Sequence, residues 1–306
     1  MIGHGFIDLH THGIGNYDTR TGRAEDILKI AEFHGKAGTC TILPTIYPAS
    51  INEMRKNTEA VRKAMQVQKS KRAEVQKLGS SEVQSSFVLP RFRTSALILG
   101  VHLEGPFLNP LRCGALNKNS FIKPTISSLK KLISGYEDII KIMTIAPEIP
   151  GALKVIEKCV ELGIKVNMGH SDATYKQAVD GKKAGATGIT HLFNAMRPFH
   201  HREPGLAGFG LIEEDLYVEV IADGVHLHPK TLGLIFNRKR LDRIILVSDS
   251  VIGAKKKGMP VYSRRGILAG SGITISDSIK LLKGIGIPGA EIIEASVDNP
   301  RRYLAI

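Results

Sequence analysis

Cysteine is scarce in this sequence. Its 306 residues include three cysteines, Cys40, Cys113 and Cys159, and no two of them form a C-x-x-C pair. An odd number with this spacing argues against a disulfide framework and against a cysteine zinc cluster, so the reducing cytoplasm is the expected location.

Long apolar runs are missing as well. No stretch approaches the roughly 18 residues that a membrane-spanning helix needs, and the N-terminus shows no basic region followed by a long apolar segment. No repeat period of the kind that builds solenoids is present. We therefore expect a soluble, unexported protein that has no membrane partner.

Acidic residues are outnumbered by basic ones. The chain has 29 Asp and Glu residues against 42 Lys and Arg residues, a net charge of +13, which suits anionic ligands such as phosphorylated metabolites or nucleic acid. Residues 51–93 concentrate this excess, with ten Lys or Arg residues and four Glu residues. We expect a long helix and then a surface loop here, with a basic insertion around residues 66–95. It is either a solvated face or a docking surface for an anionic partner.

Short apolar runs recur along the whole chain and predict strands. Segments with apolar residues three and four positions apart lie between them, as in 24–37, 150–162 and 175–184, and end near glycine as helices do. Eight such units predict a (β/α)8 TIM barrel, in one domain over residues 1–306. The alternative, a doubly wound sheet, would need a Gly-rich phosphate loop after its first strand, and none is present. The expected strands are 5–9, 39–43, 96–103, 139–145, 164–168, 188–190, 216–222 and 243–248.

Imidazole and carboxylate side chains stand where these strands end. In a barrel, the carboxyl ends of the strands and the loops after them form the face that carries catalytic groups. His10 and His12 would share one face of the first strand, which suits a divalent metal, although a structural or surface pair would look the same. Nitrogen and oxygen ligands without thiolate favour Zn²⁺, Fe²⁺, Mn²⁺ or Co²⁺. The other residues at strand ends are Glu104, His170, His191, His226 and Asp249.

Asp249 follows the last expected strand, so its carboxylate would stand at the mouth of the barrel. Beside a metal it could take a proton from water and pass it to a leaving group; an N-cap or an ion pair is the alternative. The loop 190–205 offers Arg202 as a fork for phosphate or carboxylate. Of the remaining histidines, we expect His102 to face the barrel interior and His228 to be structural.

Several of these segments, in this order, resemble the motifs of the N-acetylglucosamine-6-phosphate deacetylases of the amidohydrolase superfamily. Examples are GFIDLHTHG at 5–13 and LEGPFLN at 103–109. Each motif alone is common, but the combination is specific and runs nearly from end to end. The remaining matching segments are 169–171, 190–196, 202–208, 222–226 and 268–271.

The resemblance implies a reaction and a metal. The reaction is hydrolysis of the N-acetyl amide of N-acetylglucosamine 6-phosphate to acetate and glucosamine 6-phosphate, with hydroxide formed on the metal as nucleophile and Asp249 as general acid/base. Zn²⁺ is the first choice, with Fe²⁺, Mn²⁺ or Co²⁺ as alternatives, at one or two ions per chain. By the same resemblance, the principal metal is held by Glu104, His170 and His191, and a second one by His10 and His12.

The resemblance also implies a substrate site for a small phosphorylated amino sugar. Arg202 would reach it across the interface of a homodimer. The residues implied to contact the substrate are Asn194, Ala195 through its backbone N–H, Arg202, His226 and Ala115.

The chain departs from the family pattern in three places. A small β-sandwich domain is expected to be largely absent, because Met1 falls almost on the first strand, and the segment between Asp249 and Leu268 is short. Leu116 stands where many relatives place a polar residue that touches the substrate near its acetyl group. Two other functions stay open. Leu116 would permit an amidohydrolase that acts on another N-acyl or cyclic amide. The basic segment 51–93 would permit a non-catalytic barrel that binds a protein partner or nucleic acid, although we do not expect nucleic acid to be a partner.

Overall fold

The computed structural model describes residues 5–79, 94–253, 260–263 and 266–306. Part of the basic insertion expected around 66–95 is thus outside the described residues, as is the surface loop expected after the long helix.

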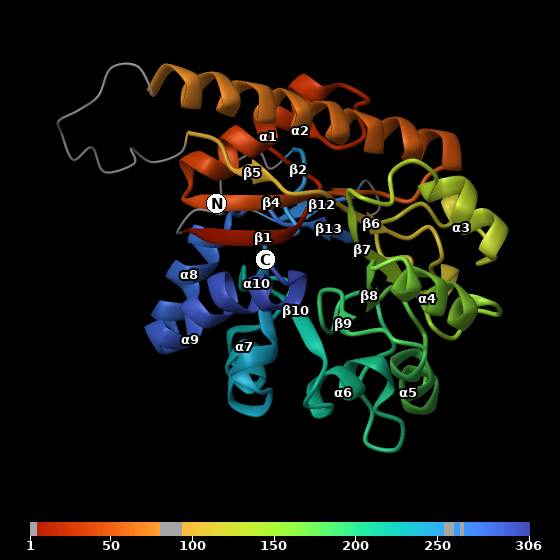
Figure 1. Cartoon of the computed structure of the whole chain (residues 1–306). Coiled ribbons are helices and arrows are strands. Elements are labelled where there is room, and N and C mark those ends of the chain that lie inside the picture. The colour runs from red at the N-terminus through yellow and green to blue at the C-terminus, as the bar shows by residue number, and fades with distance from the viewer. Residues whose placement is uncertain (1–4, 80–93, 254–259, 264–265) are drawn as a thin grey trace.

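Parallel strands form a barrel that helices surround (Figure 1). The spatial order of the strands is β1-β4-β6-β7-β8-β9-β10-β11, with β5 paired to β4. Spatial order follows chain order, as repeated strand–helix units require, so the expected TIM barrel is confirmed. The strands are β1 (Phe6–Thr11), β4 (Thr39–Ile46), β5 (Leu97–Ile98), β6 (Val101–Glu104), β7 (Ile140–Ile145), β8 (Lys165–Met168), β9 (Gly188–Ile189), β10 (Tyr217–Ile221) and β11 (Ile244–Val247).

The seam between β1 and β11 is joined by specific hydrogen bonds. The backbone N–H of Asp249 donates to the carbonyl of His10 at 2.8 Å. From inside the seam, Asp8 Oδ1 accepts from the N–H of Ser248 at 3.1 Å and from that of His10 at 3.2 Å. These bonds hold the carboxyl ends of the first and last barrel strands side by side.

The third expected strand, 96–103, is divided into β5 and β6. β5 pairs with β4, whereas β6 pairs with β4 and β7. Between them lies Gly100, where an added Cβ would stand 2.3 Å from the carbonyl oxygen of Ile139. The close approach of a segment distant in sequence therefore interrupts a run that looks continuous in its apolar pattern.

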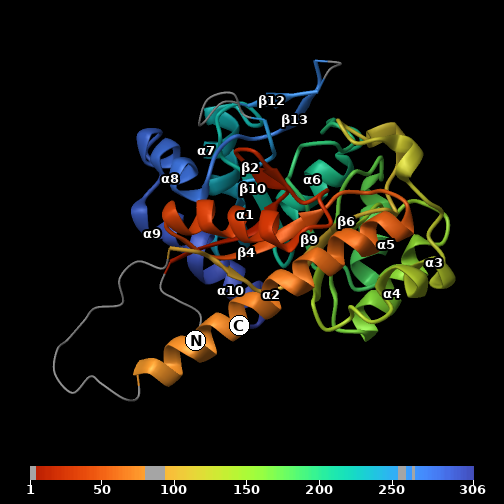
Figure 2. The same ribbon diagram turned by 90° about the horizontal axis from the view of Figure 1, so that it is seen from above.

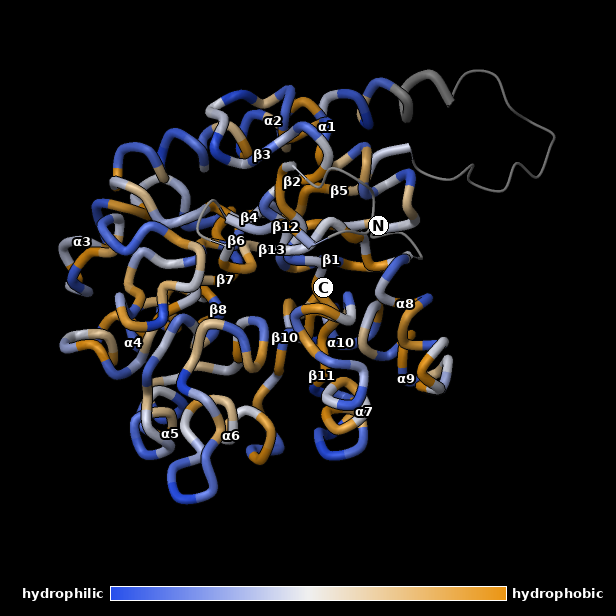
Figure 3. The backbone as a smooth tube through the Cα atoms, turned by 180° about the vertical axis from the view of Figure 1, so that it is seen from behind, coloured by the Kyte–Doolittle hydropathy of each residue, from blue (hydrophilic) through white to orange (hydrophobic). Residues whose placement is uncertain are grey.

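Helices cover the outside of the barrel, and hydrophobic colour gathers on the strands that they enclose (Figure 3). α1, α4 and α5 begin and end within two residues of the expected segments. α5 starts with a capping box, in which the side chains of Thr174 and Gln177 accept each other's backbone N–H and so fix the first turn. The helices on the barrel are α1 (Ala24–Lys36), α2 (Ile51–Gly79), α3 (Ile126–Ile133), α4 (Ala152–Glu161), α5 (Tyr175–Lys183), α6 (Gly205–Ile212), α7 (Pro229–Arg238), α8 (Ile275–Gly284), α9 (Gly289–Ile293) and α10 (Asn299–Leu304).

α2 is the long helix expected in the basic segment, and it extends beyond the barrel (Figures 1 and 2). Its inner face is buried at positions such as Met54. The Arg55 guanidinium lies 4.8 Å from the ring centre of Tyr136. Arg55 Nη1 also donates to three carbonyls at the end of α3, those of Lys131, Leu132 and Ser134.

Outside the barrel, the described residues include two short antiparallel pairs and a C-terminal cap. The pairs are β2 (Gly13–Ile14) with β3 (Tyr17–Asp18), and β12 (Val261–Tyr262) with β13 (Leu268–Gly270). α10 packs at the amino ends of the strands, where the Tyr303 ring lies 4.8 Å from that of Tyr217 at the start of β10. Assignment of residues 1–306 to one domain stays a prediction. Among the described residues, no helix has both the length and the apolar character to cross a membrane.

Candidate functional site

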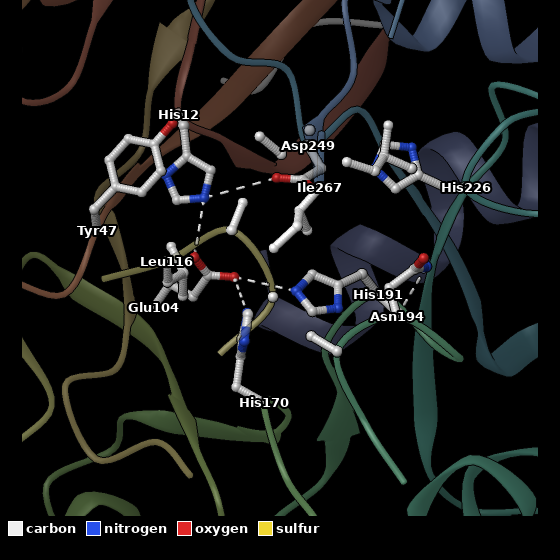
Figure 4. A pocket seen from close by; sticks show the side chains of 16 residues that line it. His12, Tyr47, Glu104, Leu116, His170, His191, Asn194, His226, Asp249 and Ile267 are labelled. Atoms are coloured by element: carbon white, nitrogen blue, oxygen red, sulfur yellow. Dashed lines mark hydrogen bonds and ion pairs between the residues drawn. The ribbon is translucent and has the colours of Figure 1, made fainter. Parts of the chain in front are cut away.

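A cavity of about 220 Å³ opens at the carboxyl ends of the barrel strands (Figure 4). Glu104 is the last residue of β6, and His12 follows β1 directly. His170, His191 and Asp249 each come two residues after β8, β9 and β11. Four of the five expected metal ligands and the expected acid/base Asp249 thus line one cavity, and the fifth ligand, His10, is fully buried beside His12.

Glu104 lies at the centre of this cluster. Its Oε1 is 3.1 Å from both His170 Nε2 and His191 Nε2, and its Oε2 is 3.2 Å from His12 Nε2. His12 Nε2 is in turn 3.2 Å from His10 Nε2. Four imidazoles from three different strand ends therefore aim the same ring nitrogen at one small volume.

For His12 and His170, backbone carbonyls decide which ring nitrogen carries the proton. Nδ1 of His12 is 3.0 Å from the carbonyl of Thr45, and Nδ1 of His170 is 3.0 Å from that of Arg112. A carbonyl oxygen can only accept, so Nδ1 donates in both rings, and in the neutral form each Nε2 presents a lone pair. Lone pairs and carboxylate oxygens that face one another at these distances need a cation or a proton between them.

The donor set therefore fits a divalent metal. Glu104, His170 and His191 form one group that could hold an ion, and His10, His12 and Asp249 form another. Both groups consist of imidazole nitrogen and carboxylate oxygen, the ligands that Zn²⁺ and neighbouring transition metals accept.

Burial and mutual contact set the ionisation of the cluster. Burial lowers the pKa of His10 to about 4, which leaves its ring neutral at pH 7. Burial opposes the ionisation of Glu104, but the imidazoles of His170 and His12 outweigh it and hold the pKa of that carboxyl well below its usual range. At His191, burial is likewise outweighed, by the hydrogen bond to Glu104, and the pKa rises to about 9. Glu104 is therefore ionised at neutral pH, and the positive charge of His191 lies opposite it.

The backbone is strained at the residues that face the cavity. His170, His191 and Asp249 have φ values of 47°, 29° and 46°, in the left-handed region that residues other than glycine rarely adopt. Such conformations persist only where surrounding structure imposes them, and they gather at functional sites. Here each follows a strand end and turns the side chain into the cavity.

The sequence model of the amidohydrolase family matches residues 4–261 of this chain. The chain belongs to the amidohydrolase family. It is 31% identical, over 99% of its length, to an N-acetylglucosamine-6-phosphate deacetylase of Lysinibacillus sphaericus, of which it covers 76%. It is 28% identical, over 98% of its length, to an N-acetylgalactosamine-6-phosphate deacetylase of Escherichia coli O157:H7, of which it covers 77%.

Solved structures agree with this assignment. The N-acetylglucosamine-6-phosphate deacetylase of Thermotoga maritima has a TM-score of 0.79 at 30% identity, over 98% of this chain and 78% of that one. A variant of the Mycobacterium smegmatis enzyme in complex with N-acetyl-D-glucosamine-6-phosphate has a TM-score of 0.80 at 27% identity, over 99% of this chain and 77% of that one. The expected resemblance is confirmed, and the chain is a hydrolytic enzyme that spans about three quarters of the length of these relatives.

The residues expected to contact substrate are brought together in this amidohydrolase with one exception. Ala115, Asn194, Ala195 and His226 line the cavity. The ring of His226 is oriented by Asp223, whose Oδ2 lies 2.7 Å from Nδ1. The exception is Arg202, which is exposed and outside the cavity lining, with Nη1 3.2 Å from His201 Nε2.

Tyr47 is a cavity residue of the amidohydrolase that the sequence did not single out. It follows β4 directly, and its ring stacks on that of His12 with centroids 3.8 Å apart. The Arg20 guanidinium lies 4.3 Å from the Tyr47 ring centre. Its position one residue after a barrel strand was the available signal.

Two histidines of the amidohydrolase outside the cavity match their expected roles. His102 is buried in the barrel interior, with Nδ1 3.0 Å from the carbonyl of Leu9 and Nε2 2.8 Å from Thr144 Oγ1. His228 is the N-cap of α7 and accepts from the N–H of Lys230. Both are structural in the contacts that they make.

Proposed function

We propose that this amidohydrolase hydrolyses the acetyl amide of N-acetylglucosamine 6-phosphate, releasing acetate and glucosamine 6-phosphate. The observation that carries the proposal is that Glu104, Asp249 and three imidazoles converge on one cavity, whose wall also contains Asn194 and His226. The three imidazoles are those of His12, His170 and His191. The named deacetylases to which the chain is similar over almost its whole length support the same reaction.

The proposed metal is Zn²⁺, with Fe²⁺, Mn²⁺ or Co²⁺ as alternatives. Glu104, His170 and His191 would hold the principal ion, and His10 with His12 would hold a second. Such an ion supplies Lewis acidity, which makes water a stronger acid and polarises a carbonyl.

Asp249 is the proposed general acid/base. Its Oδ1 lies 3.6 Å from His10 Nε2 and 3.7 Å from His12 Nε2, and its side chain is almost buried. In the proposed reaction, Asp249 takes a proton from the water whose oxygen bonds to the acetyl carbon. It gives that proton to the sugar nitrogen as the C–N bond breaks, so the amine leaves without a negative charge.

The proposed grip on the sugar phosphate combines polar groups of two chains. Asn194, the backbone N–H of Ala195, Ala115 and His226 belong to the cavity wall of one chain. Arg202, exposed in the single chain, would come from the second chain of a homodimer. Two exposed apolar side chains, Phe199 and Leu234, line a neighbouring groove that shares His226 with the cavity, and they support such an interface.

The deciding experiment is an acetate-release assay run beside metal analysis of the same preparation. We expect one or two divalent ions per chain and acetate release from N-acetylglucosamine 6-phosphate. N-acetylgalactosamine 6-phosphate is the comparison substrate, because a relative bears that name. Metal-loaded protein that releases no acetate from N-acetylglucosamine 6-phosphate would contradict the proposal, and release from N-acetylgalactosamine 6-phosphate alone would assign the site to that sugar instead.

One observation favours a second candidate function, hydrolysis of another N-acyl or cyclic amide. Leu116 lines the cavity beside Glu104 (Figure 4), and an apolar side chain cannot donate to a carbonyl. The test is the same assay with N-propionyl and N-butyryl glucosamine 6-phosphates. A higher kcat/KM for a longer acyl chain than for acetyl would favour this function over deacetylation.

The cytoplasm is the proposed location. In its support, none of the three cysteines, all of which lie in the described part of the chain, forms a disulfide.

A further inference from the structure

A carboxylate lies inside the barrel, below the metal-binding cavity. Glu219 on β10 has a side chain that is 2% exposed, and its own strand and two neighbouring barrel strands contribute Ile221, Leu9 and Val247 to a buried hydrophobic cluster. A carboxyl group in such surroundings is costly unless its oxygens are hydrogen-bonded. Its contacts therefore identify what the group does.

Each oxygen of Glu219 meets a different partner. Oε2 lies 3.0 Å from His10 Nδ1, and Oε1 accepts from Asn167 Nδ2 at 2.8 Å. The Asn167 Oδ1 accepts in turn from the hydroxyl of Tyr303 on α10. A buried chain of side chains thus runs through the barrel, from its capped amino end to His10 at its carboxyl end.

Gly188 makes room for this chain on β9. A Cβ at Gly188 would lie 2.1 Å from Asn167 Oδ1 and 2.9 Å from the Tyr303 hydroxyl. Any larger residue would displace the amide that orients Glu219. Residues of β8, β9, β10 and α10 therefore all contribute to the contact between Glu219 and His10.

We propose that Glu219 is a positioning residue that sets the His10 ring for the second metal. By accepting from Nδ1–H, it fixes the tautomer in which Nε2 carries the lone pair, and it orients that lone pair toward His12 and Asp249. Carboxylate or carbonyl partners of this kind are common behind metal-binding histidines. The inference rests on the proposed metal centre and extends it to a residue outside the cavity.

Glu219 itself is not the ligand of a third ion. His10, His102 and Glu219 are close enough to form a metal-binding group. However, both nitrogens of His102 are already bonded, to the carbonyl of Leu9 and to Thr144, and His10 Nδ1 is bonded to Glu219. The group is thus satisfied by hydrogen bonds.

The first test measures the His10 tautomer in metal-free protein by ¹⁵N NMR of the histidine side chains. His10→Gln identifies the His10 signals by their loss. We expect one tautomer, with the proton on Nδ1, in the wild type and in the control Val220→Ala, which alters the opposite face of the same strand. In Glu219→Leu we expect a mixture of tautomers.

The second test titrates the same proteins with Co²⁺ and follows visible absorbance and bound-metal content. We expect Glu219→Leu to lose about 10- to 100-fold in affinity for one of two ions and to keep the other. Glu219→Gln, which retains an acceptor for Nδ1–H, should lose less, and Tyr303→Phe less again. The Gln variant also serves if Glu219→Leu does not fold.

The outcomes separate this inference from the proposed function. Two ions bound as tightly in Glu219→Leu as in the wild type, with His10 in an unchanged tautomer, would overturn the inference. Uptake of a single ion by the wild type would overturn it too. Uptake of two ions without acetate release would overturn the proposed function alone.

Discussion

Asp249 combines three features that few residues of a chain share. It stands two residues after the last barrel strand, its backbone is in the left-handed region, and its carboxylate faces two imidazoles. The carbonyl of Asp249 accepts from the N–H of Ser271 at 2.9 Å, so the residue is held from both sides of the barrel mouth. A group held in this way fits the proposed proton transfer, because it needs little reorganisation.

Asp249→Asn is therefore expected to lower kcat by about 10²- to 10⁴-fold, because an amide cannot shuttle the proton. Metal content should stay at the wild-type level, since the amide oxygen occupies the same place. Acetate release and metal analysis check the two statements. The matched control is Asp138→Asn, at an exposed residue before β7, which should leave acetate release and metal content unchanged. Full activity in Asp249→Asn would show that Asp249 is not the general acid/base.

Among the elements, most barrel strands deliver a residue to the same rim, and this places the site there. Parallel strands place all carboxyl ends together, and the helices outside hold the strands in register. α2 shows how such packing is secured at a helix terminus. The Arg55 side chain covers the last carbonyls of α3, which no turn of that helix can satisfy.

Arg55→Ala is expected to destabilise the protein by about 1–2 kcal/mol, because carbonyls at the α3 terminus lose a charged donor and the Tyr136 ring keeps only the guanidinium of Arg62. Urea denaturation followed by circular dichroism measures the change. The adjacent residue Lys56 is exposed on the same helix, so Lys56→Ala is the control, with an effect within about 0.5 kcal/mol. Equal midpoints for the two variants would show that the Arg55 contacts add no stability.

The basic charge of α2 beyond the barrel can be tested apart from its packing. Lys69→Glu with Lys71→Glu changes exposed side chains, so acetate release should be unchanged. A nucleic-acid titration at two salt concentrations tests the alternative of a binding surface. Tight binding that weakens steeply with salt in the wild type, and is lost in the double variant, would favour that alternative.

At the scale of the whole molecule, the proposed dimer makes the site depend on two chains. Arg202→Ala and Asp249→Asn should each have low activity as pure proteins. In mixed dimers, one site receives an intact Asp249 from one chain and an intact Arg202 from the other. Co-expression of the two variants should therefore restore about a quarter of wild-type activity.

The mixed-dimer experiment with Arg202→Ala and Asp249→Asn needs a control in which neither chain has an intact Asp249. Two copies of Asp249→Asn with different affinity tags, purified as a mixed pair, should show no recovery. No recovery in the Arg202/Asp249 mixture, although size-exclusion chromatography shows dimers, would place Arg202 outside the partner's site. A monomer in solution would contradict the dimer itself.

The amino-acid sequence by itself determined the barrel and most of the rim. Alternating apolar runs and helical periodicity are local properties, so the strands and helices such as α1, α4 and α5 appear where the pattern predicts them. Residues behind strand ends are also readable from the sequence, because in a parallel barrel the end of a strand already specifies a place on one face. For that reason the sequence alone predicts that Glu104, His170, His191 and Asp249 share one face of the barrel.

Only the tertiary structure decided the features that depend on contacts between distant segments. The break between β5 and β6 arises where Gly100 passes Ile139, and Tyr47 becomes a cavity residue by stacking on His12. The chain from Tyr303 to His10 joins residues from four separate elements. No local pattern contains these contacts, since burial and hydrogen-bond geometry exist only once the barrel has closed around them.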